Sequence, residues 1–145
     1  GKDIFVILQA KSKKHVKKQI IHYKIYTIMN TNIELSLLDA EEKALLNYIW
    51  NLIPEEDKQG MTQNDVLLVL DLMDDYLLEN GLLEEDDQTG ETTYLDGEID
   101  ENEQQEYLLN ALKEQGVKLS AVQVQLIMDA ELQYGIEQGY YQEEE

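Results

Sequence analysis

The sequence predicts an α+β fold that is mainly α, in which two sequence-related helix hairpins supply four core helices. Apolar residues recur at helical spacing in four separate segments, and a capping residue, a proline or a glycine marks the ends of each segment. Residues 61–87 also resemble residues 119–145, with identical residues at seven of the 27 aligned positions when the chain is shifted by 58. A chain of 145 residues is long enough for one compact domain with a hydrophobic core.

The first predicted helix covers residues 39–53. Its apolar side chains fall on one face, and Asp39 with Glu42 has the spacing of a capping box at the start. Pro54 has no backbone N–H to continue the helix, so the helix is expected to end there.

The second predicted helix begins after Thr62, which is expected to cap it, and runs to about Asn80. Gly81 follows as the residue that adopts a left-handed conformation after a helix. Because this helix is apolar on several sides, it is predicted to be the central helix of the core. Residues 82–95 contain two short strand-like runs around a QTG turn and predict a β-hairpin.

The second half of the chain repeats this order. Asp100 is expected to cap a third helix that runs to about Gln115, and Ser120 a fourth that runs to about Gln138. A short strand is predicted near residues 140–144. The sequence therefore predicts two copies of one unit, helix, turn, helix, glycine and strand, which bury their apolar faces against each other about a pseudo-two-fold axis.

The predicted repeat units are residues 39–87 and 102–145, and both lie in an acidic domain, residues 31–145. Residues 1–30 form a basic N-terminal extension with a net charge of +6, whereas the rest of the chain carries −26, which gives −20 in total. Residues 4–10 read as a strand. The following lysine-rich stretch fits both a helix and a strand. One hypothesis makes Met29 the biological start of the protein; the rival hypothesis places the lysine-rich arm on the acidic body.

Composition argues against several classes of function. The chain has no cysteine for disulfides or thiolate chemistry, no apolar run long enough to cross a bilayer, and no arginine. A strongly acidic body repels polyanions, so nucleic acid is not an expected ligand. His15 and His22 lack further ligands nearby, and no nucleophile or phosphate-binding motif is present. We therefore expect a cytoplasmic, non-enzymatic protein without a cofactor.

Residues 62–95 resemble a winged-helix module in outline. TQNDVLLVLDLMDDYLLEN has the place of the recognition helix, and GLLEE and TTYL have the places of the wing strands around the QTG tip. The resemblance covers about a quarter of the chain. Members of that family that bind DNA carry Lys or Arg on the helix and wing. Acids occupy those places here, so the resemblance implies the shape and not DNA binding.

DGEIDENE, residues 96–103, is similar to the second half of an EF-hand calcium loop and makes Asp96, Asp100 and Glu103 candidate calcium ligands. Thr92 and Tyr94 stand where the opening ligands of such a loop are needed. A tight turn followed by a capping box explains the same residues without a metal.

The function we expect from the sequence is an acidic protein-interaction or regulatory module that binds a basic protein partner. An alternative is a DNA mimic, in which carboxylates take the place of phosphates and block a DNA-binding protein. A homodimer is a further arrangement that the sequence leaves open. The candidate interaction residues are acids of the first repeat and the tyrosine pair that replaces Leu82 and Leu83 in the second. They are Asp71, Asp74, Asp75, Glu84, Glu85, Asp86, Asp87, Tyr140 and Tyr141.

Overall fold

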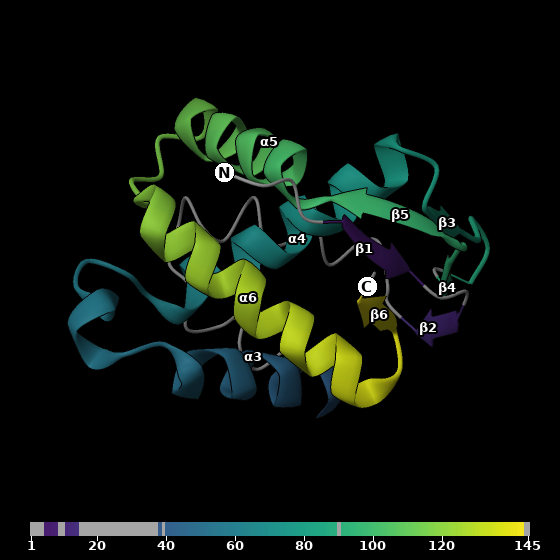
Figure 1. Cartoon of the computed structure of the whole chain (residues 1–145), viewed down its shortest axis with the longest axis horizontal. Coiled ribbons are helices and arrows are strands. Elements are labelled where there is room, and N and C mark those ends of the chain that lie inside the picture. Colours follow the sequence, from purple (N-terminus) through teal and green to yellow (C-terminus); the bar gives the residue numbers. More distant parts are fainter. Residues whose placement is uncertain (1–4, 9–10, 15–37, 39, 90, 144–145) are drawn as a thin grey trace.

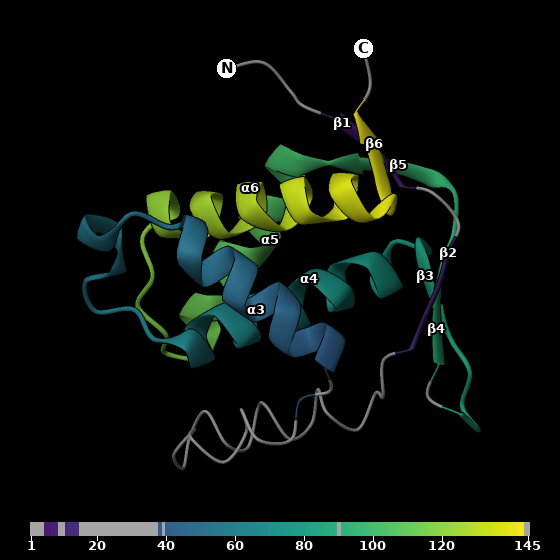
Figure 2. The same ribbon diagram turned by 90° about the horizontal axis from the view of Figure 1, so that it is seen from below.

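The computed structural model describes residues 5–8, 11–14, 38, 40–89 and 91–143, and it has the predicted α+β, mainly α, architecture (Figure 1). The predictions for Asp39, His15, His22 and Met29 lie outside the described residues. The helices of the core are α3 (Ala40–Leu52), α4 (Gln63–Glu79), α5 (Glu101–Glu114) and α6 (Ala121–Gln138), and a 3-10 turn, η1 (Glu55–Lys58), follows α3. The described strands gather at one end of the helices (Figure 2).

The predicted capping residues at the starts of α4 and α6 are confirmed, and both form full capping boxes. Thr62 Oγ1 accepts a hydrogen bond from Asp65 N at 3.2 Å, and Asp65 Oδ2 accepts one from Thr62 N at 2.9 Å. Ser120 and Gln123 exchange the equivalent pair of bonds, both at 3.0 Å. The two helices therefore begin in the same way, 58 residues apart.

The ends of α4 and α6 also match. Gly81 and Gly139 both adopt the left-handed conformation, with φ of 72° and 82°. That conformation lets the next backbone N–H reach back to the last turn of the helix. The two bonds are Leu82 N to Leu77 O at 2.8 Å and Tyr140 N to Gly135 O at 2.7 Å.

The two helix hairpins pack crosswise. Helix α3 of the first hairpin lies chiefly against α6 of the second, and α4 lies against α5. A tyrosine pair in edge-to-face contact joins the partners at each of these interfaces: Tyr48 with Tyr134 at 5.2 Å, and Tyr107 with Tyr76 at 5.4 Å between ring centroids. In both pairs the tyrosine of the shorter helix donates a hydrogen bond to a glutamate of the longer helix, Tyr48 to Glu137 and Tyr107 to Glu79. The same contact thus occurs on both sides of a pseudo-two-fold arrangement.

Helix α4 is the most buried element, as predicted, and ten of its 17 residues are buried. This is also the helix to which the winged-helix resemblance gives the place of a recognition helix. Its apolar side chains join those of the other three helices in one core. A second, smaller cluster lies between the helices and the strands and is made of Tyr76, Leu77, Leu83, Tyr94, Ile99 and Tyr141.

The described strands form two three-stranded sheets in which all neighbours are antiparallel. Strands β3 and β4 form the predicted hairpin, and β6 is the predicted final strand. One sheet has the order β5-β1-β6, with β5 at Gly97–Asp100, β1 at Phe5–Leu8 and β6 at Tyr141–Glu143. The other has the order β2-β4-β3, with β2 at Lys11–Lys14, β4 at Glu91–Tyr94 and β3 at Leu83–Glu85.

The sheets extend the pseudo-symmetry to the strands. The pairing of β1 with β5 and of β2 with β4 continues in one register, so the four strands make a ribbon whose halves belong to different sheets. The pairing of Leu8 with Tyr141 corresponds to that of Tyr94 with Leu83. Under the pseudo-two-fold symmetry, β1 therefore corresponds to β4, β2 to β5 and β3 to β6. The repeat found in the sequence did not include β1 and β2. Strands pair through their backbones, so equivalent strands need no similar side chains, and β1 (FVIL) and its counterpart β4 (ETTY) share no residue.

Candidate functional site

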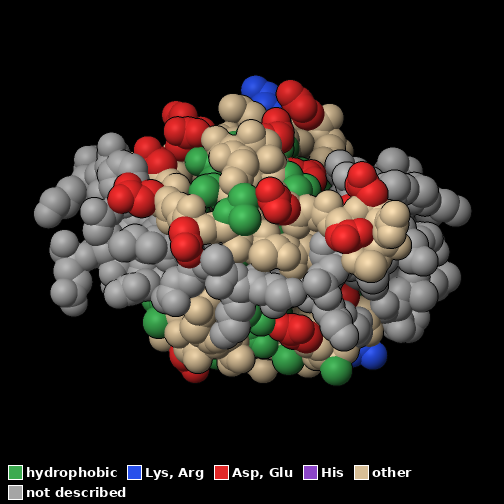
Figure 3. All heavy atoms as spheres, turned by 90° about the vertical axis from the view of Figure 1, so that its right-hand side faces the viewer, with side chains coloured by type: hydrophobic (Ala, Val, Ile, Leu, Met, Phe, Trp, Pro, Cys, Tyr) green, Lys and Arg blue, Asp and Glu red, His purple; other side chains and the backbone are tan. Residues whose placement is uncertain are grey.

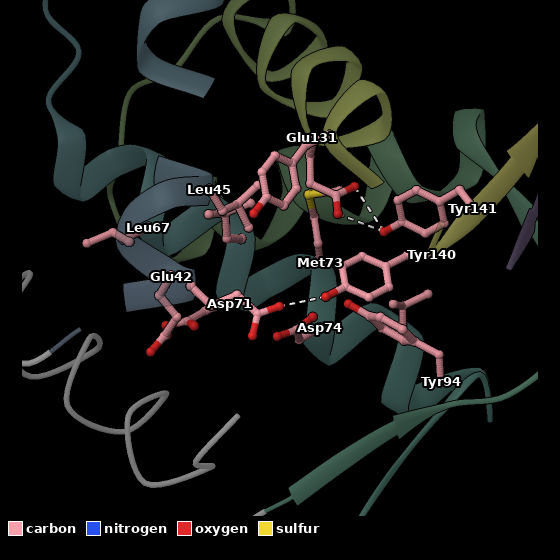
Figure 4. Close-up of a pocket in the computed structure, with 14 residues that line it drawn as sticks. Glu42, Leu45, Leu67, Asp71, Met73, Asp74, Tyr94, Glu131, Tyr140 and Tyr141 are labelled. Atoms are coloured by element: carbon pink, nitrogen blue, oxygen red, sulfur yellow. Dashed lines mark hydrogen bonds between the residues drawn. The ribbon is translucent and has the colours of Figure 1, made fainter. Parts of the chain in front are cut away.

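An acidic pocket lies between α3, α4 and α6, where β4 and β6 meet the helices (Figure 4). It has about 750 Å³ of open space, counting its mouth. Its lining residues, which we call the acidic pocket throughout, are Glu41, Glu42, Leu45, Leu67, Leu70, Asp71, Met73, Asp74, Leu77, Tyr94, Glu131, Tyr134, Tyr140 and Tyr141.

The apolar part of the pocket belongs to the hydrophobic core. It consists of Leu45 from α3 and Leu67, Leu70, Met73 and Leu77 from α4. Helix α4 supplies most of these residues because it is apolar on several sides. Leu67, Met73 and Leu77 are buried, whereas Leu45 and Leu70 are half-buried. The apolar surface that a ligand can bury here is therefore chiefly that of Leu45 and Leu70.

Carboxylates surround this apolar surface. Glu41 and Glu42 come from the first turn of α3, Asp71 and Asp74 from α4, and Glu131 from α6. Asp71 is the most buried of them, at 1% exposure. No Lys, Arg or His is among the described residues that line the pocket. The charged side chains of the described lining therefore all contribute negative potential.

Four tyrosines complete the wall. The rings of Tyr94 and Tyr140 are in edge-to-face contact at 5.8 Å. The Tyr141 hydroxyl donates to Glu131, whose two carboxylate oxygens lie 3.0 and 2.8 Å away, and the Tyr140 hydroxyl donates to Glu41 Oε1 at 2.6 Å. Figure 4 shows these hydroxyls pointing toward the acids of the helices. The hydrogen bonds fix the two glutamates at the wall of the pocket.

Tyr141 is a permanent hydrogen-bond donor in this site. Burial raises the pKa of its hydroxyl well above the ordinary value of 10, and the negative charge of Glu131, the neighbouring Tyr94 hydroxyl, the hydrogen bond to Glu131 and the charge of Asp74 raise it further. Tyr141 is therefore uncharged at neutral pH, so the negative potential of the pocket arises from its carboxylates.

The pseudo-symmetric position on the other side holds only a small pocket of about 230 Å³. Met73 and Glu131, which have equivalent places on α4 and α6, line both pockets. Leu132 replaces Asp74 there, and Asp129, the equivalent of Asp71, is exposed. The large acidic pocket is thus a feature of one side of the described structure.

A glycine beside the pocket distinguishes the two repeats. Gly135 on α6 has the place of Leu77 on α4, and a Cβ at Gly135 would lie 2.2 Å from the ring of Tyr141. The missing side chain gives the Tyr141 ring its space beside α6. In the first repeat the corresponding pair is Leu77 and Leu83, both buried.

Four of the predicted interaction residues converge on the acidic pocket. Asp71, Asp74, Tyr140 and Tyr141 all line it, although α4 and β6 are far apart in the sequence. Asp75 lies on another side of α4, where its charge helps to raise the pKa of Tyr107 after the larger effects of burial and of Glu79.

The remaining predicted acids lie in the β3–β4 hairpin, away from the pocket. Glu84 and Glu85 are in β3, and Asp86 and Asp87 are in the following turn. Asp86 Oδ1 accepts hydrogen bonds from the backbone of Gln88 at 2.8 Å and of Thr89 at 3.1 Å. Asp86 therefore shapes the tip of the hairpin.

The calcium candidates Asp96, Asp100 and Glu103 have other partners. Asp100 Oδ1 caps α5 by accepting from Asn102 N at 3.0 Å and Glu103 N at 3.2 Å. Glu103 Oε1 accepts a hydrogen bond from the Tyr76 hydroxyl at 3.3 Å. In the part of the chain that the structure describes, no three or more His, Asp or Glu side chains are placed to hold a metal ion.

Sequence reasoning missed Glu41, Glu42 and Glu131 as site residues. The sequence could have indicated Glu131, because it follows the buried Ile127 by four positions and so lies near the inner face of α6. It also stands in the place of the apolar Met73 of the first repeat. An acid at an inward helical position is costly unless it is paired or lines a pocket.

Acids also occur outside the pocket. In Figure 3, which faces the sheet end of the molecule, the Asp and Glu side chains are spread among apolar and uncharged atoms and do not form one block.

Within the described residues, no helix is both long and apolar enough to cross a membrane. No known family model matches the chain, and neither curated proteins nor solved structures gave a match.

Proposed function

We propose that the protein is a non-enzymatic interaction module that binds a basic protein partner through the acidic pocket. The observation that carries this proposal is the composition of the pocket wall: five carboxylates around an apolar floor, with no Lys, Arg or His among its described residues. Such a site favours a ligand that has both positive charge and apolar surface.

Charge and burial have separate roles in this proposal. A net charge of −20 attracts a basic partner over a distance and speeds association, and this effect decreases with salt. The apolar floor acts only after contact, so it determines how slowly the complex dissociates.

The polar groups of the pocket support binding better than catalysis. They are carboxylates and tyrosines, and Tyr141 has a raised pKa that keeps its proton in place. Catalysis by a nucleophile needs a group that an adjacent base can activate. The hydroxyls of Tyr140 and Tyr141 instead donate to glutamates and hold them in position.

The proposal can be tested by calorimetric titration of the whole chain with lysine-containing basic peptides at low and high salt. Two variants with the same change of net charge are compared: Glu42→Gln with Asp74→Asn in the pocket, and Glu84→Gln with Asp87→Asn in the hairpin. We expect the pocket variant to lose about tenfold in affinity at both salt concentrations and the hairpin variant to lose less than threefold.

Equal losses in the two variants would show that overall charge attracts the peptides, and the pocket would have no special role. Absence of binding to the unchanged protein at low salt would contradict the proposal. Competition by duplex DNA for a captured DNA-binding protein is the outcome that the alternative of DNA mimicry predicts.

A further inference from the structure

We propose that Asn80 and Gly81, which end α4, form a covalent modification site: the folded helix end holds back deamidation of Asn80, and opening of that end releases it. Among the asparagines of the chain, only Asn80 is followed by glycine. Glycine has no Cβ to shield its backbone nitrogen, so that nitrogen attacks a preceding asparagine side chain more readily than the nitrogen of any other residue. Both residues are exposed, so water and hydroxide reach them. Neither lines the acidic pocket.

The reaction needs only water and hydroxide. Hydroxide removes the proton from Gly81 N, which then forms a bond to Asn80 Cγ. The bond between Cγ and Nδ2 breaks, and the amide nitrogen takes a proton from water and leaves as ammonia. Water opens the resulting succinimide ring in one of two ways. Breaking the bond between Cγ and Gly81 N gives aspartate, whereas breaking the bond between the Asn80 carbonyl carbon and Gly81 N gives isoaspartate, in which the backbone runs through Cβ.

The backbone at Asn80 keeps the reacting atoms apart. Its ψ of 6° places Gly81 N on the same side of the Cα–C bond as Asn80 N. Cβ is a different substituent of the tetrahedral Cα, so it points away from Gly81 N. The succinimide ring closes only when Cβ and Gly81 N lie on one side of that bond. The backbone therefore has to rotate, and the end of α4 has to open, before the reaction can begin.

Hydrogen bonds hold both reacting groups in this conformation. Asn80 Nδ2 donates to Tyr76 O at 2.8 Å, and Asn80 N donates to the same carbonyl at 3.1 Å. Gly81 N, which would be the nucleophile, donates to Leu78 O at 3.2 Å. The last turn of α4 thus engages the side chain that is attacked and the nitrogen that attacks it. Deamidation is therefore expected to follow the fraction of time for which this turn is open.

Conversion of Asn80 is a one-way change at a junction of the fold. An aspartate has no Nδ2 to donate to Tyr76 O, and its charge would lie at the negative end of the helix dipole. An isoaspartate lengthens the backbone just before the turn into β3, which begins at Leu83. The Tyr76 ring contacts Tyr107 of α5. Modification at this point therefore loosens the contacts of α4 with both α5 and β3.

The second repeat provides a matched comparison. Gln138 and Gly139 have the places of Asn80 and Gly81, and Gly139 has the same left-handed conformation as Gly81. A glutamine has one more methylene group, so it would have to close a larger ring, and it reacts far more slowly. The reactive pair is therefore found in the first repeat alone. The variant Gln138→Asn transfers it to the equivalent helix end.

The test incubates the whole chain at mildly alkaline pH, with and without guanidinium chloride, and measures conversion of each asparagine by peptide mapping with mass spectrometry. We expect Asn80 to convert at least about tenfold more slowly in the folded protein than in the denatured protein, because only the opened helix end reacts. In the variant Gln138→Asn, position 138 should show the same protection. The variant Asn80→Gln should abolish the reaction at position 80 in both conditions.

Equal rates of conversion with and without denaturant would overturn the proposal, because the folded helix end would then give no protection. Conversion of other asparagines as fast as Asn80 in the denatured chain would also overturn it. The variant Asn80→Asp tests the effect of the product. Amide hydrogen exchange at the end of α4 should be at least about threefold faster in this variant than in the unchanged protein, and an unchanged rate would overturn the one-way loosening.

Discussion

At the scale of single residues, one position decides how the two copies of the repeat differ. Gly135 leaves room for the ring of Tyr141, while its equivalent Leu77 fills that space and faces Leu83. A tyrosine at position 141 brings a hydroxyl to Glu131, and a leucine at position 83 has no such group. The glycine therefore allows a polar group to reach the acidic pocket from β6.

The substitution Gly135→Ala should destabilise the protein, because the added Cβ would lie 2.2 Å from the Tyr141 ring. We expect a loss of about 1–3 kcal/mol in the free energy of unfolding, measured by urea denaturation. The double variant Gly135→Leu with Tyr141→Leu copies the pair of the first repeat and should be more stable than Gly135→Leu alone. Gly97→Ala is the control: its Cβ would meet only the flexible end of Leu82, so it should cost less.

Tyr76 should make stability depend on pH in the alkaline range. Burial, followed by the charge of Glu103, the hydrogen bond to that residue and the charge of Asp100, raises its pKa to about 12. The unfolded chain releases this proton near pH 10, so the stabilisation is complete below that value and is lost as the pH rises toward 12.

The measurement for Tyr76 is the free energy of unfolding between about pH 9 and 11.5, with Tyr76→Phe as the comparison. The phenylalanine variant should lose less stability over this range, because one proton-linked group has been removed. Equal slopes for the two proteins would show that Tyr76 does not contribute. Tyr48, Tyr107 and Tyr141, whose pKa values are also raised, contribute to the slope that persists in the variant.

At the scale of elements, the repeat is clearest where local chemistry specifies it. The starts of α4 and α6 have the same capping box, and their ends have the same left-handed glycine. Such signals involve residues only three to six positions apart, so the sequence could predict them. Helix α3 lies chiefly against α6, a contact between distant segments that no local pattern contains.

Removal of either cap should cost the same. Thr62→Ala and Ser120→Ala each leave a backbone N–H of the first turn without its side-chain acceptor, and each should lower stability by about 1 kcal/mol. Thermal unfolding of both variants measures this, with Val122→Ala at an exposed position of α6 as the control. A difference of more than about 1 kcal/mol between the two caps would contradict their equivalence.

The acidic pocket was only partly predictable for the same reason. Asp71 and Asp74 were visible as acids of one helix, and Tyr140 and Tyr141 as an unusual pair, but nothing in the sequence placed them together. Their convergence depends on how α6 and β6 cross α4, which is a property of packing between distant segments. The four helices, the β3–β4 hairpin and the last strand were predicted, because each has its own periodicity and end signals.

At the scale of the whole molecule, charge is the dominant property. A net charge of −20 repels itself within a compact structure, and residues 31–145 alone carry −26. The described acids of the sheet end are spread over the surface, so this repulsion acts broadly (Figure 3). Screening by salt should therefore stabilise the protein.

We expect the melting temperature to rise when sodium chloride is increased from about 0.01 to about 0.5 M. A variant in which Glu84, Glu98 and Glu106 are replaced by glutamine should show a smaller rise, because it has less repulsion to screen. All three positions are exposed, so the substitutions should leave the core intact. A melting temperature that falls with salt would show that attractive ion pairs outweigh the repulsion.

The sheet β5-β1-β6 has a consequence for how the chain folds. Its middle strand comes from residues 5–8, and both neighbours lie about 90 or more residues further along. During synthesis on the ribosome, β1 therefore emerges long before either strand with which it pairs. Contacts between residues so far apart in the sequence are slow to form. We therefore expect this sheet to be completed late in folding, after the helix hairpins have assembled.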